Sequence, residues 1–389
     1  MQVDTQGYTE KPFKFTGNAV EFFGIWVVNI ALTLLSLGIY SAWAKVRTKQ
    51  YFYGNTLLDH SAFQYLATPI QILKGRLITV LFFGIYYAIS AINPIWSAGL
   101  TILIGLLIPS VIVLSMSFRM RNTAYRNITF QFQRNFKQAY LIFAGPVVLF
   151  AALFYLSSLF SSELKVTSTF AVAVEDEFKT PFVLIGFMII AFLFYPFWEF
   201  LQTRFLIANM RFGRSEFQFD THAGSFYKVY CIALLLFILA VSVYTAILAS
   251  FELISYLDIQ FLSEGAPPDD HLIMISILSI FIIYLWLYAY IQTAKTNMIL
   301  NHVRLAGMPL ESSLSVSYMF YLYISNSIAI IASMGLLIPW TLIRVANYRA
   351  RTLSFLTDTN IDSFIAQQQK ELSALGEEFG EIFDIDVGI

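Results

Sequence analysis

The chain has 389 residues, of which 58% are apolar, 17% aromatic and only 13% charged, and its mean hydropathy is +0.67. A soluble domain usually carries about 25% charged residues, so this chain has too little charge to cover a water-exposed surface. The composition excludes a soluble enzyme, a disordered protein and a nucleic-acid-binding protein. It indicates a polytopic membrane protein.

The polar and apolar stretches divide the chain into three parts. Residues 1–18 are polar, so we expect no cleavable signal peptide and interpret them as a cytoplasmic N-terminal segment. Residues 19–351 form the predicted membrane domain. Residues 352–389 form an acidic cytoplasmic tail with eight carboxylates and one lysine.

Six segments are apolar over the ~20 residues that a helix needs to cross a membrane. They cover residues 77–93, 95–118, 139–160, 182–203, 229–250 and 272–293. Helices are expected because an unpaired strand would leave its backbone groups without partners in lipid. The predicted fold is therefore an all-α helical bundle.

The basic residues predict the orientation of these spans. Nineteen Lys and Arg lie in the links 44–76, 119–138, 199–228, 294–317 and 344–351. The alternate links, 161–181 and 250–271, contain only Lys165 and Lys179 and are acidic. Because basic loops stay in the cytoplasm, the basic links are predicted to be cytoplasmic, together with both termini.

Two apolar end elements, residues 19–43 and 316–343, are copies of each other. Four residues recur at a constant offset of 297 positions: Asn29, Gly38, Trp43 and Arg47 return as Asn326, Gly335, Trp340 and Arg344. Each element either crosses the membrane or bends at its glycine and re-enters. Both alternatives stay open at this point.

A second internal repeat lies in three basic links. Each contains a Phe-Gln-aromatic triplet: Phe63-Gln64-Tyr65, Phe130-Gln131-Phe132 and Phe217-Gln218-Phe219. The triplets follow Asn55, Asn127 and Asn209, and a degraded fourth copy starts at Asn301. The alternation is typical of a short strand with one wet face, so we expect short β-like hairpins at the cytoplasmic interface. They serve either as interfacial anchors or as a common platform.

The N-terminal region resembles the YjgN family of bacterial inner-membrane proteins. The resemblance rests on Phe15-Thr-Gly-Asn18, Glu21-Phe-Phe, the segment from Leu35 to Arg47, Tyr51-Phe-Tyr-Gly-Asn-Thr56 and Ile72-Leu-Lys-Gly-Arg76, and it extends over most of the chain. It implies a location in the bacterial inner membrane and a domain of unknown function. It implies no catalytic residues.

The sequence contains few residues in arrangements typical of enzymes. The sequence has no phosphate-binding loop, no nucleophile elbow, no dinucleotide fingerprint and no pair of histidines at helical metal-binding spacing. We therefore predict no enzymatic activity, no cofactor and no metal site.

Four polar residues are predicted to form a cavity or polar site within the membrane. Glu21, Asn29 and Asn326 lie inside the end elements, and Glu199 lies near the inner end of a span. Intramembrane polar groups often have functional roles. The alternatives are hydrogen bonds from the asparagines to neighbouring helices and an interfacial ion pair between Glu199 and Arg204.

Four basic residues are candidates for contacts with lipid headgroups: Lys74, Arg76, Arg47 and Arg344. Contact with lipid phosphate and simple anchoring on the cytoplasmic side explain them equally well. In the tail, residues 361–380 have apolar side chains at helical spacing. We expect this amphipathic helix to dock on the basic links of the same chain or on a cytoplasmic protein partner.

The leading functional hypothesis is a transporter or channel for a lipid or small amphiphile, because internal duplication is common in transporters. The alternative is a non-transporting membrane scaffold or assembly factor that holds partners through its cytoplasmic face and acidic tail. Membrane lipids are expected partners in both cases, and nucleic acid is not.

Overall fold

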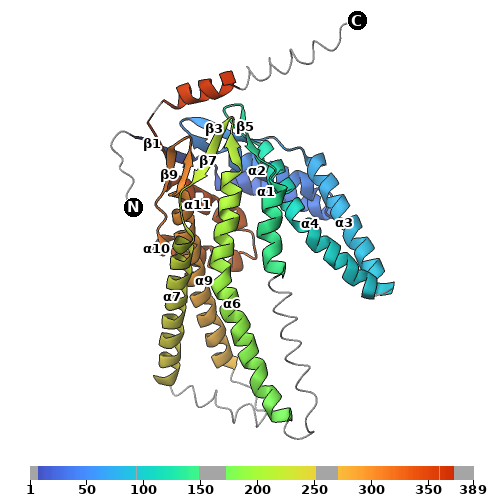
Figure 1. Cartoon of the computed structure of the whole chain (residues 1–389). Coiled ribbons are helices and arrows are strands. Elements are labelled where there is room, and N and C mark those ends of the chain that lie inside the picture. The colour runs from blue at the N-terminus through green and yellow to red at the C-terminus, as the bar shows by residue number, and fades with distance from the viewer. Residues whose placement is uncertain (1–7, 93, 149–171, 251–269, 359, 372–389) are drawn as a thin grey trace.

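The computed structural model describes residues 8–92, 94–148, 172–250, 270–358 and 360–371. Its centre is a closed antiparallel barrel with the strand order β1-β10-β9-β8-β7-β6-β5-β4-β3-β2. Helices extend from one end of the barrel, and a short helix lies over the other end (Figure 1). The strands are β1 (Thr9–Phe15), β2 (Thr56–Leu58), β3 (Ser61–Tyr65), β4 (Thr123–Tyr125), β5 (Ile128–Phe132), β6 (Met210–Phe212), β7 (Ser215–Phe219), β8 (Val303–Leu305), β9 (Met308–Ser312) and β10 (Leu353–Thr357).

The expectation of an all-α bundle is therefore wrong. The triplets predicted as short β-like hairpins, either separate anchors or parts of a common platform, are strands β3, β5 and β7 of one closed barrel. Their partners lie far away in the sequence: Phe63 pairs with Tyr125, and Phe130 with Phe212. Local periodicity reports that a segment is extended, but not which distant strand completes it.

The helices are arranged as hairpins between the strands. They are α1 (Ala19–Leu35), α2 (Ser41–Gly54), α3 (Pro69–Ile92), α4 (Pro94–Arg121), the helix at 136–148, α6 (Val172–Ala208), α7 (Ala223–Ser250), α9 (Asp270–Leu300), α10 (Val316–Ala332) and α11 (Ile338–Arg351). Each of five successive units leaves the barrel along one strand and returns along the next, as in β1-α1-α2-β2. The two strands of each unit pair with each other.

Two-residue turns join successive units. At three of them both turn residues have positive φ: Asp59 and His60, Arg126 and Asn127, and Ala306 and Gly307. This backbone conformation matches the twist of short hairpins. Asn127 is thus a turn residue rather than the repeat position that we predicted.

Asn122, at the end of α4, occupies the place of Asn55 and Asn209. Each of these three side-chain amides donates to the carbonyl oxygen four residues earlier, at 2.9 Å for Asn55 and 2.7 Å for the other two. The same carbonyl oxygen also accepts the backbone N–H of the asparagine, so the side chain adds a second hydrogen bond at the helix end. An Asn in this position precedes three of the four hairpin turns, whereas the amide of Asn301, before the fourth, donates to the Ser312 carbonyl oxygen.

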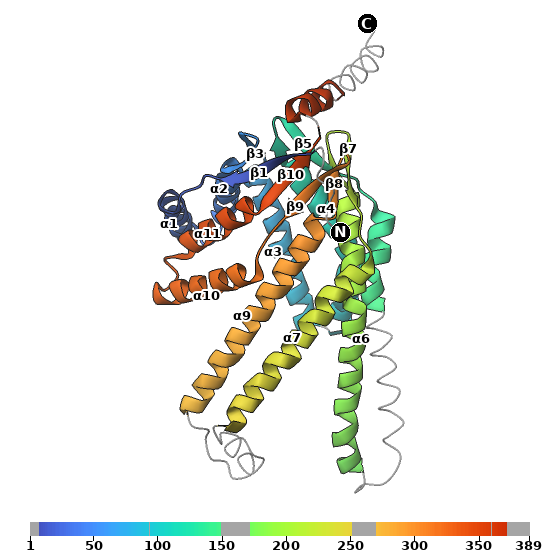
Figure 2. The ribbon, with the colours of Figure 1, turned by 90° about the vertical axis from the view of Figure 1, so that its left-hand side faces the viewer.

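The two end elements are short helical hairpins. α1 and α2 join through a bend with Leu37 at φ 51° and Gly38 at φ 91°, and α10 and α11 join through Met334 at φ 49° and Gly335 at φ 91°. Because both strands of each unit belong to the barrel, each hairpin starts and ends on the barrel side. Figure 2 shows α10 and α11 beside the barrel end of α9, with α1 and α2 next to α11.

Four described helices are long and apolar enough to cross a membrane. They span Pro69–Ile92, Gly99–Arg121, Ala223–Ile247 and Met274–Leu300, and they overlap four of the predicted spans. Of the other two, residues 139–148 lie in the helix at 136–148 and residues 182–203 lie in α6, while 149–160 fall outside the described residues.

The interior of the barrel is filled by apolar side chains, at least one from each strand. Ten of them form five cross-strand pairs: Phe13 with Leu58, Phe63 with Tyr125, Phe130 with Phe212, Phe217 with Leu305, and Leu310 with Phe355. Alternate residues such as Gln64, Gln131 and Gln218 are exposed. The barrel is thus a packed core rather than a pore.

The helix at residues 361–371 covers the mouth of the barrel. Its Ile361, Phe364 and Ile365 pack on the interior side chains, and Arg126 in the β4–β5 turn pairs with Asp362. Arg126 and Lys11 also pair with Asp59, at 3.0 and 2.7 Å. The tail helix therefore docks on a charged turn of its own chain.

A side chain that fills the barrel should be needed for stability. Phe212 is 2% exposed, so Phe212→Ala removes buried contacts on all sides and should lower the free energy of unfolding by about 3–5 kcal/mol. Thermal unfolding of the detergent-solubilised protein measures the effect. Phe83→Ala on α3, where the ring is 59% exposed, is the matched control; an equal loss in both variants would contradict the packed barrel.

The charged turn should make barrel stability depend on pH. The hydrogen bond from Lys11 lowers the pKa of the Asp59 carboxyl, against the opposing effect of burial, and the charges of Lys11 and Arg126 lower it further. A carboxyl with a lowered folded-state pKa stabilises the fold above its unfolded pKa of about 4, and this stabilisation is lost as the pH falls through the folded value.

We therefore expect the melting temperature to fall less steeply between pH 6 and pH 3 in Asp59→Asn than in the unchanged protein. Asp358→Asn, at an exposed residue just after β10, should keep the original slope. Identical slopes in all three proteins would show that Asp59 contributes nothing to the acid dependence.

Candidate functional site: two related pockets

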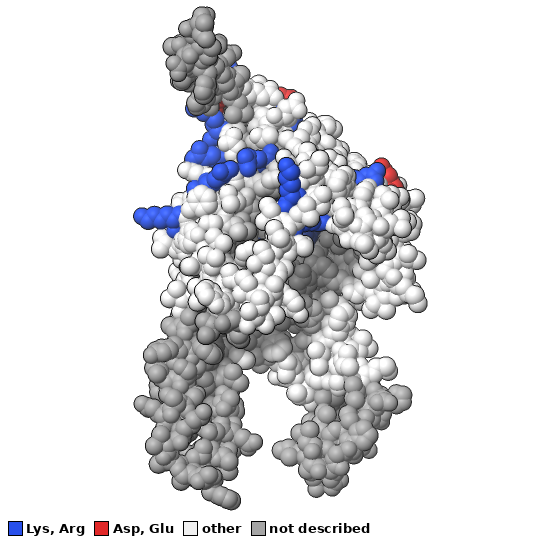
Figure 3. All heavy atoms as spheres, turned by 90° about the vertical axis from the view of Figure 1, so that its right-hand side faces the viewer, with Lys and Arg blue, Asp and Glu red and all other residues white. Residues whose placement is uncertain are grey.

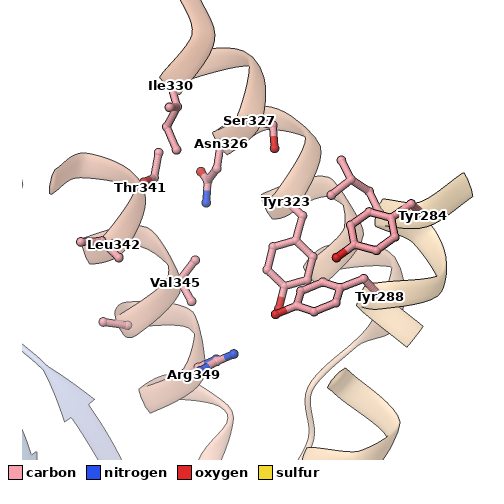
Figure 4. Close-up of a pocket in the computed structure, with 12 residues that line it drawn as sticks. Tyr284, Tyr288, Tyr323, Asn326, Ser327, Ile330, Thr341, Leu342, Val345 and Arg349 are labelled. Carbon is pink, nitrogen blue, oxygen red and sulfur yellow. The ribbon is translucent and has the colours of Figure 1, made fainter. Parts of the chain in front are cut away.

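A pocket of about 560 Å³ lies between α9, α10 and α11 and is called here the α10–α11 pocket. In Figure 4 the rings of Tyr284, Tyr288 and Tyr323 stand on one side, and Asn326 and Val345 face them from the other. The full lining is Tyr284, Leu285, Tyr288, Tyr323, Asn326, Ser327, Ile330, Thr341, Leu342, Val345, Ala346 and Arg349. The pocket is thus largely apolar and aromatic, with a single buried amide.

A second pocket of about 610 Å³, the α1–α2 pocket, lies between the helices of the other end hairpin. Its lining is Trp26, Asn29, Ile30, Thr33, Leu34, Ala44, Lys45, Thr48 and Lys49. Shifted by the repeat offset of 297 positions, eight of these nine residues fall on lining residues of the α10–α11 pocket; Leu34 is the exception. The two pockets are therefore the same feature of two copies of one element.

The central amide is satisfied in one pocket and not in the other. Arg344 donates to Asn326 Oδ1 at 2.8 Å and to Ser325 Oγ at 3.0 Å, and its guanidinium lies 4.5 Å from the Trp340 ring. Arg47, the equivalent of Arg344, donates to the Tyr40 hydroxyl at 3.0 Å instead. Asn29 is 4% exposed, and neither polar atom of its side chain has a hydrogen-bond partner within the described part of the chain.

The predicted polar site is thus distributed over the fold. Asn29 and Asn326 line separate pockets rather than one cavity. Glu21 lines neither pocket; it accepts a hydrogen bond from the Tyr51 hydroxyl at 3.1 Å. Glu199 lies on α6, among three packed helices.

Glu199 belongs to a polar cluster that joins α6, α7 and α9. Lys295 of α9 pairs with Glu199 at 2.8 Å, and the Tyr230 hydroxyl of α7 donates to the same carboxylate. The side chains of Glu199 and Lys295 are only 15% and 22% exposed. The partner of Glu199 is therefore Lys295, not Arg204, and the pair links helices that are distant in sequence.

The four predicted headgroup residues have different surroundings. Arg344 and Arg47 make the contacts given above, Arg76 donates to the Ser41 hydroxyl at the start of α2, and Lys74 is exposed. On the side where α3 and α4 lie, Lys and Arg side chains form a band across the surface, and the described surface below it in that view carries no charged side chain (Figure 3). Such a band suits the boundary between headgroups and hydrocarbon.

Two lysines of the α1–α2 pocket, Lys45 and Lys49, were not among the predicted site residues. The repeat offset contained the signal: it places them at the positions of Leu342 and Ala346. Lys49 lies 4.7 Å from the centre of the Tyr65 ring. Burial lowers the pKa of Lys49, and the nearby charges of Arg119 and Lys45 lower it further.

In chemical terms the two pockets offer apolar surface, an amide and cationic side chains: Lys45 and Lys49 in the α1–α2 pocket, and Arg349 in the α10–α11 pocket. Among the described residues, no three His, Cys, Asp or Glu side chains come together as a metal ion would require. The pockets are thus equipped to bind a molecule, and the apolar helices that carry the fold define an integral membrane protein.

The chain matches, over residues 10–382, the family described as a bacterial protein of unknown function (DUF898), and it belongs to that family. The inner membrane protein YjgN of Escherichia coli (strain K12) is 24% identical over 357 residues, covering 89% of this chain and 88% of the relative. The protein of the same name from Salmonella typhimurium (strain LT2) is 35% identical over 149 residues, a match that spans 36% of each chain. No solved structure matches the chain. These relatives and the apolar helices place the protein in the inner membrane.

The Glu199–Lys295 pair generates a prediction. Lys295→Met leaves a poorly exposed carboxylate without its cation, so the free energy of unfolding should fall by about 3 kcal/mol. The double variant Glu199→Gln with Lys295→Met removes both charges and should recover most of that loss. Thermal unfolding in detergent measures both variants. A double variant no more stable than Lys295→Met would contradict the pairing.

Proposed function

We propose that the protein carries or passes a lipid or small amphiphile, which enters the α10–α11 and α1–α2 pockets from the membrane. The observation behind the proposal is that two repeat-related pockets keep one amide at the same position in otherwise mostly apolar linings. Ligand pockets commonly have this composition and a volume of about 300–1,000 Å³. Internal duplication, common in transporters, adds support.

The rims of the pockets favour a ligand from the bilayer over one from water. Leu34 is 71% exposed at the α1–α2 pocket, and Tyr284 and Leu342 are 59% and 43% exposed at the α10–α11 pocket. Large apolar side chains exposed around an opening are stable when they face lipid. We infer that the ligand itself has an apolar part.

The distribution of basic residues supports a cytoplasmic barrel. The basic links lead into the barrel strands, and both β1 and β10 belong to it. With basic loops retained in the cytoplasm, the barrel and both chain ends lie on the cytoplasmic side of a multi-pass protein. The pockets then serve the cytoplasmic leaflet.

The second candidate is a non-transporting scaffold, and the barrel favours it. Apolar side chains from all ten strands fill the interior, and the helix at 361–371 covers the mouth. Any transported molecule would therefore pass beside the barrel and not through it. A scaffold would need the barrel only as a rigid platform.

Movement of a fluorescent lipid across vesicles tests transport. We expect proteoliposomes to move an NBD-labelled phosphatidylcholine between leaflets several-fold faster than protein-free vesicles, as measured by dithionite quenching. Ser327→Trp, which fills the α10–α11 pocket, should remove most of this acceleration. Ile328→Trp is the matched control, because Ile328 is the next residue along α10, is 62% exposed and does not line the pocket.

Two outcomes would count against transport. No acceleration by the unchanged protein would reject it and favour the scaffold. Equal loss in Ser327→Trp and Ile328→Trp would reject the pocket as the route of the lipid.

A further inference from the structure

The amide of Asn29 is an unusual feature of the α1–α2 pocket. A buried polar side chain is normally hydrogen-bonded, and leaving one unpaired is costly. Asn29 is 4% exposed, and neither its carbonyl oxygen nor its nitrogen has a partner within the described residues. The same residue lines the pocket, so its unpaired amide lies beside any molecule bound there.

The other copy of the element shows what a satisfied amide looks like. There Arg344 fills the role of partner to Asn326. In the α1–α2 hairpin, Arg47 is held by the Tyr40 hydroxyl. The difference between the copies is thus a redirected arginine, and it leaves a donor and an acceptor on Asn29 for a ligand.

The number and position of the cations distinguish the pockets further. Lys45 and Lys49 line the α1–α2 pocket where Leu342 and Ala346 line the other, whose lining has one cationic side chain, the exposed Arg349. Within the described part of the chain neither lysine forms an ion pair with a carboxylate. Arg119 lies close enough to repel the charge on Lys49. The charged form of Lys49 is therefore destabilised when no anion is bound.

We propose that the α1–α2 pocket binds the phosphate-bearing anionic headgroup of a membrane lipid, and that the α10–α11 pocket does not share this preference. The phosphate lies against Lys45 and Lys49, and Asn29 donates to a headgroup oxygen. The acyl chains of the bound lipid lie along Trp26 and Leu34, next to the surrounding bilayer. The inference rests on the proposed function only in that the pockets take ligands from the membrane.

Competitive photolabelling tests the preference. The full-length protein is placed in phosphatidylcholine nanodiscs with diazirine-bearing phosphatidic acid or phosphatidylcholine, and labelled peptides are mapped by mass spectrometry. We expect α1–α2 peptides to label more strongly with phosphatidic acid, and α10–α11 peptides to label equally with both. Lys45→Gln and Lys49→Gln should each lower the ratio in α1–α2 about fivefold.

Two further variants distinguish binding in the pocket from a general effect of charge on labelling and from an effect on folding. Lys137→Gln removes an exposed lysine outside the pocket and should leave the labelling ratio unchanged. Asn29→Leu should lower the ratio and raise the melting temperature, since it removes a buried polar group without a partner. A side chain needed only for structure would instead lower the melting temperature.

A transplant gives the complementary result. Leu342→Lys combined with Ala346→Lys should create a preference for phosphatidic acid in the α10–α11 peptides. Equal labelling of α1–α2 by both lipids in the unchanged protein would overturn the proposal. So would a loss of the ratio in Lys137→Gln equal to that in Lys45→Gln.

A competition arm identifies the source of the anion. Inorganic phosphate at constant ionic strength, with chloride as control, is added during labelling. Displacement shows that the pocket recognises free phosphate as well as the headgroup; no displacement shows that the lipid anchor is required. If the protein does not accelerate lipid movement but the labelling ratio persists, only the transport proposal is rejected. If lipid movement is accelerated but α1–α2 labels equally with both lipids, only the headgroup site is rejected.

Discussion

Pairing between the first and last strands holds the fold together. Residues 9–12 of β1 pair with residues 354–357 of β10, and this contact converts a row of hairpins into a closed barrel. A row of short strands would otherwise end in two edges with unpaired backbone groups. Closure satisfies them, surrounds the ring of apolar side chains and gives each helical hairpin a fixed place. It also makes the two end hairpins neighbours, so that α1 contacts α11.

The local parts of this architecture were predictable from the sequence, and the closure was not. Alternation in Phe63-Gln64-Tyr65 correctly indicated a strand with one buried face, because side-chain direction follows from the nearest residues. Nothing near Phe63 identifies Tyr125 as its partner. The all-α prediction failed for this reason: strands of three to seven residues carry too little signal, and the helices between them dominate the composition.

The candidate site was predictable to a similar degree. The constant offset singled out Asn29 and Asn326, and the structure places both in pockets. Their separation into two pockets depends on barrel geometry, since repeat units adjacent around a barrel do not face each other. Lys45 and Lys49 were missed because lysines near a membrane boundary are common; only their replacement by Leu342 and Ala346 in the other copy sets them apart. The Glu199–Lys295 pair depends on helix packing that no local pattern records.

Closure of the barrel also determines the order in which the molecule is completed during synthesis. β10 is the last strand, and β1 is the first, so β1 keeps an unpaired edge while more than 300 residues are made. Contacts between such distant segments form slowly because a long loop must close first. The helices of the earlier units therefore enter the membrane before their common anchor exists. The helix at 361–371 follows β10 and can dock only on a finished barrel, which makes its docking a natural mark of completed assembly.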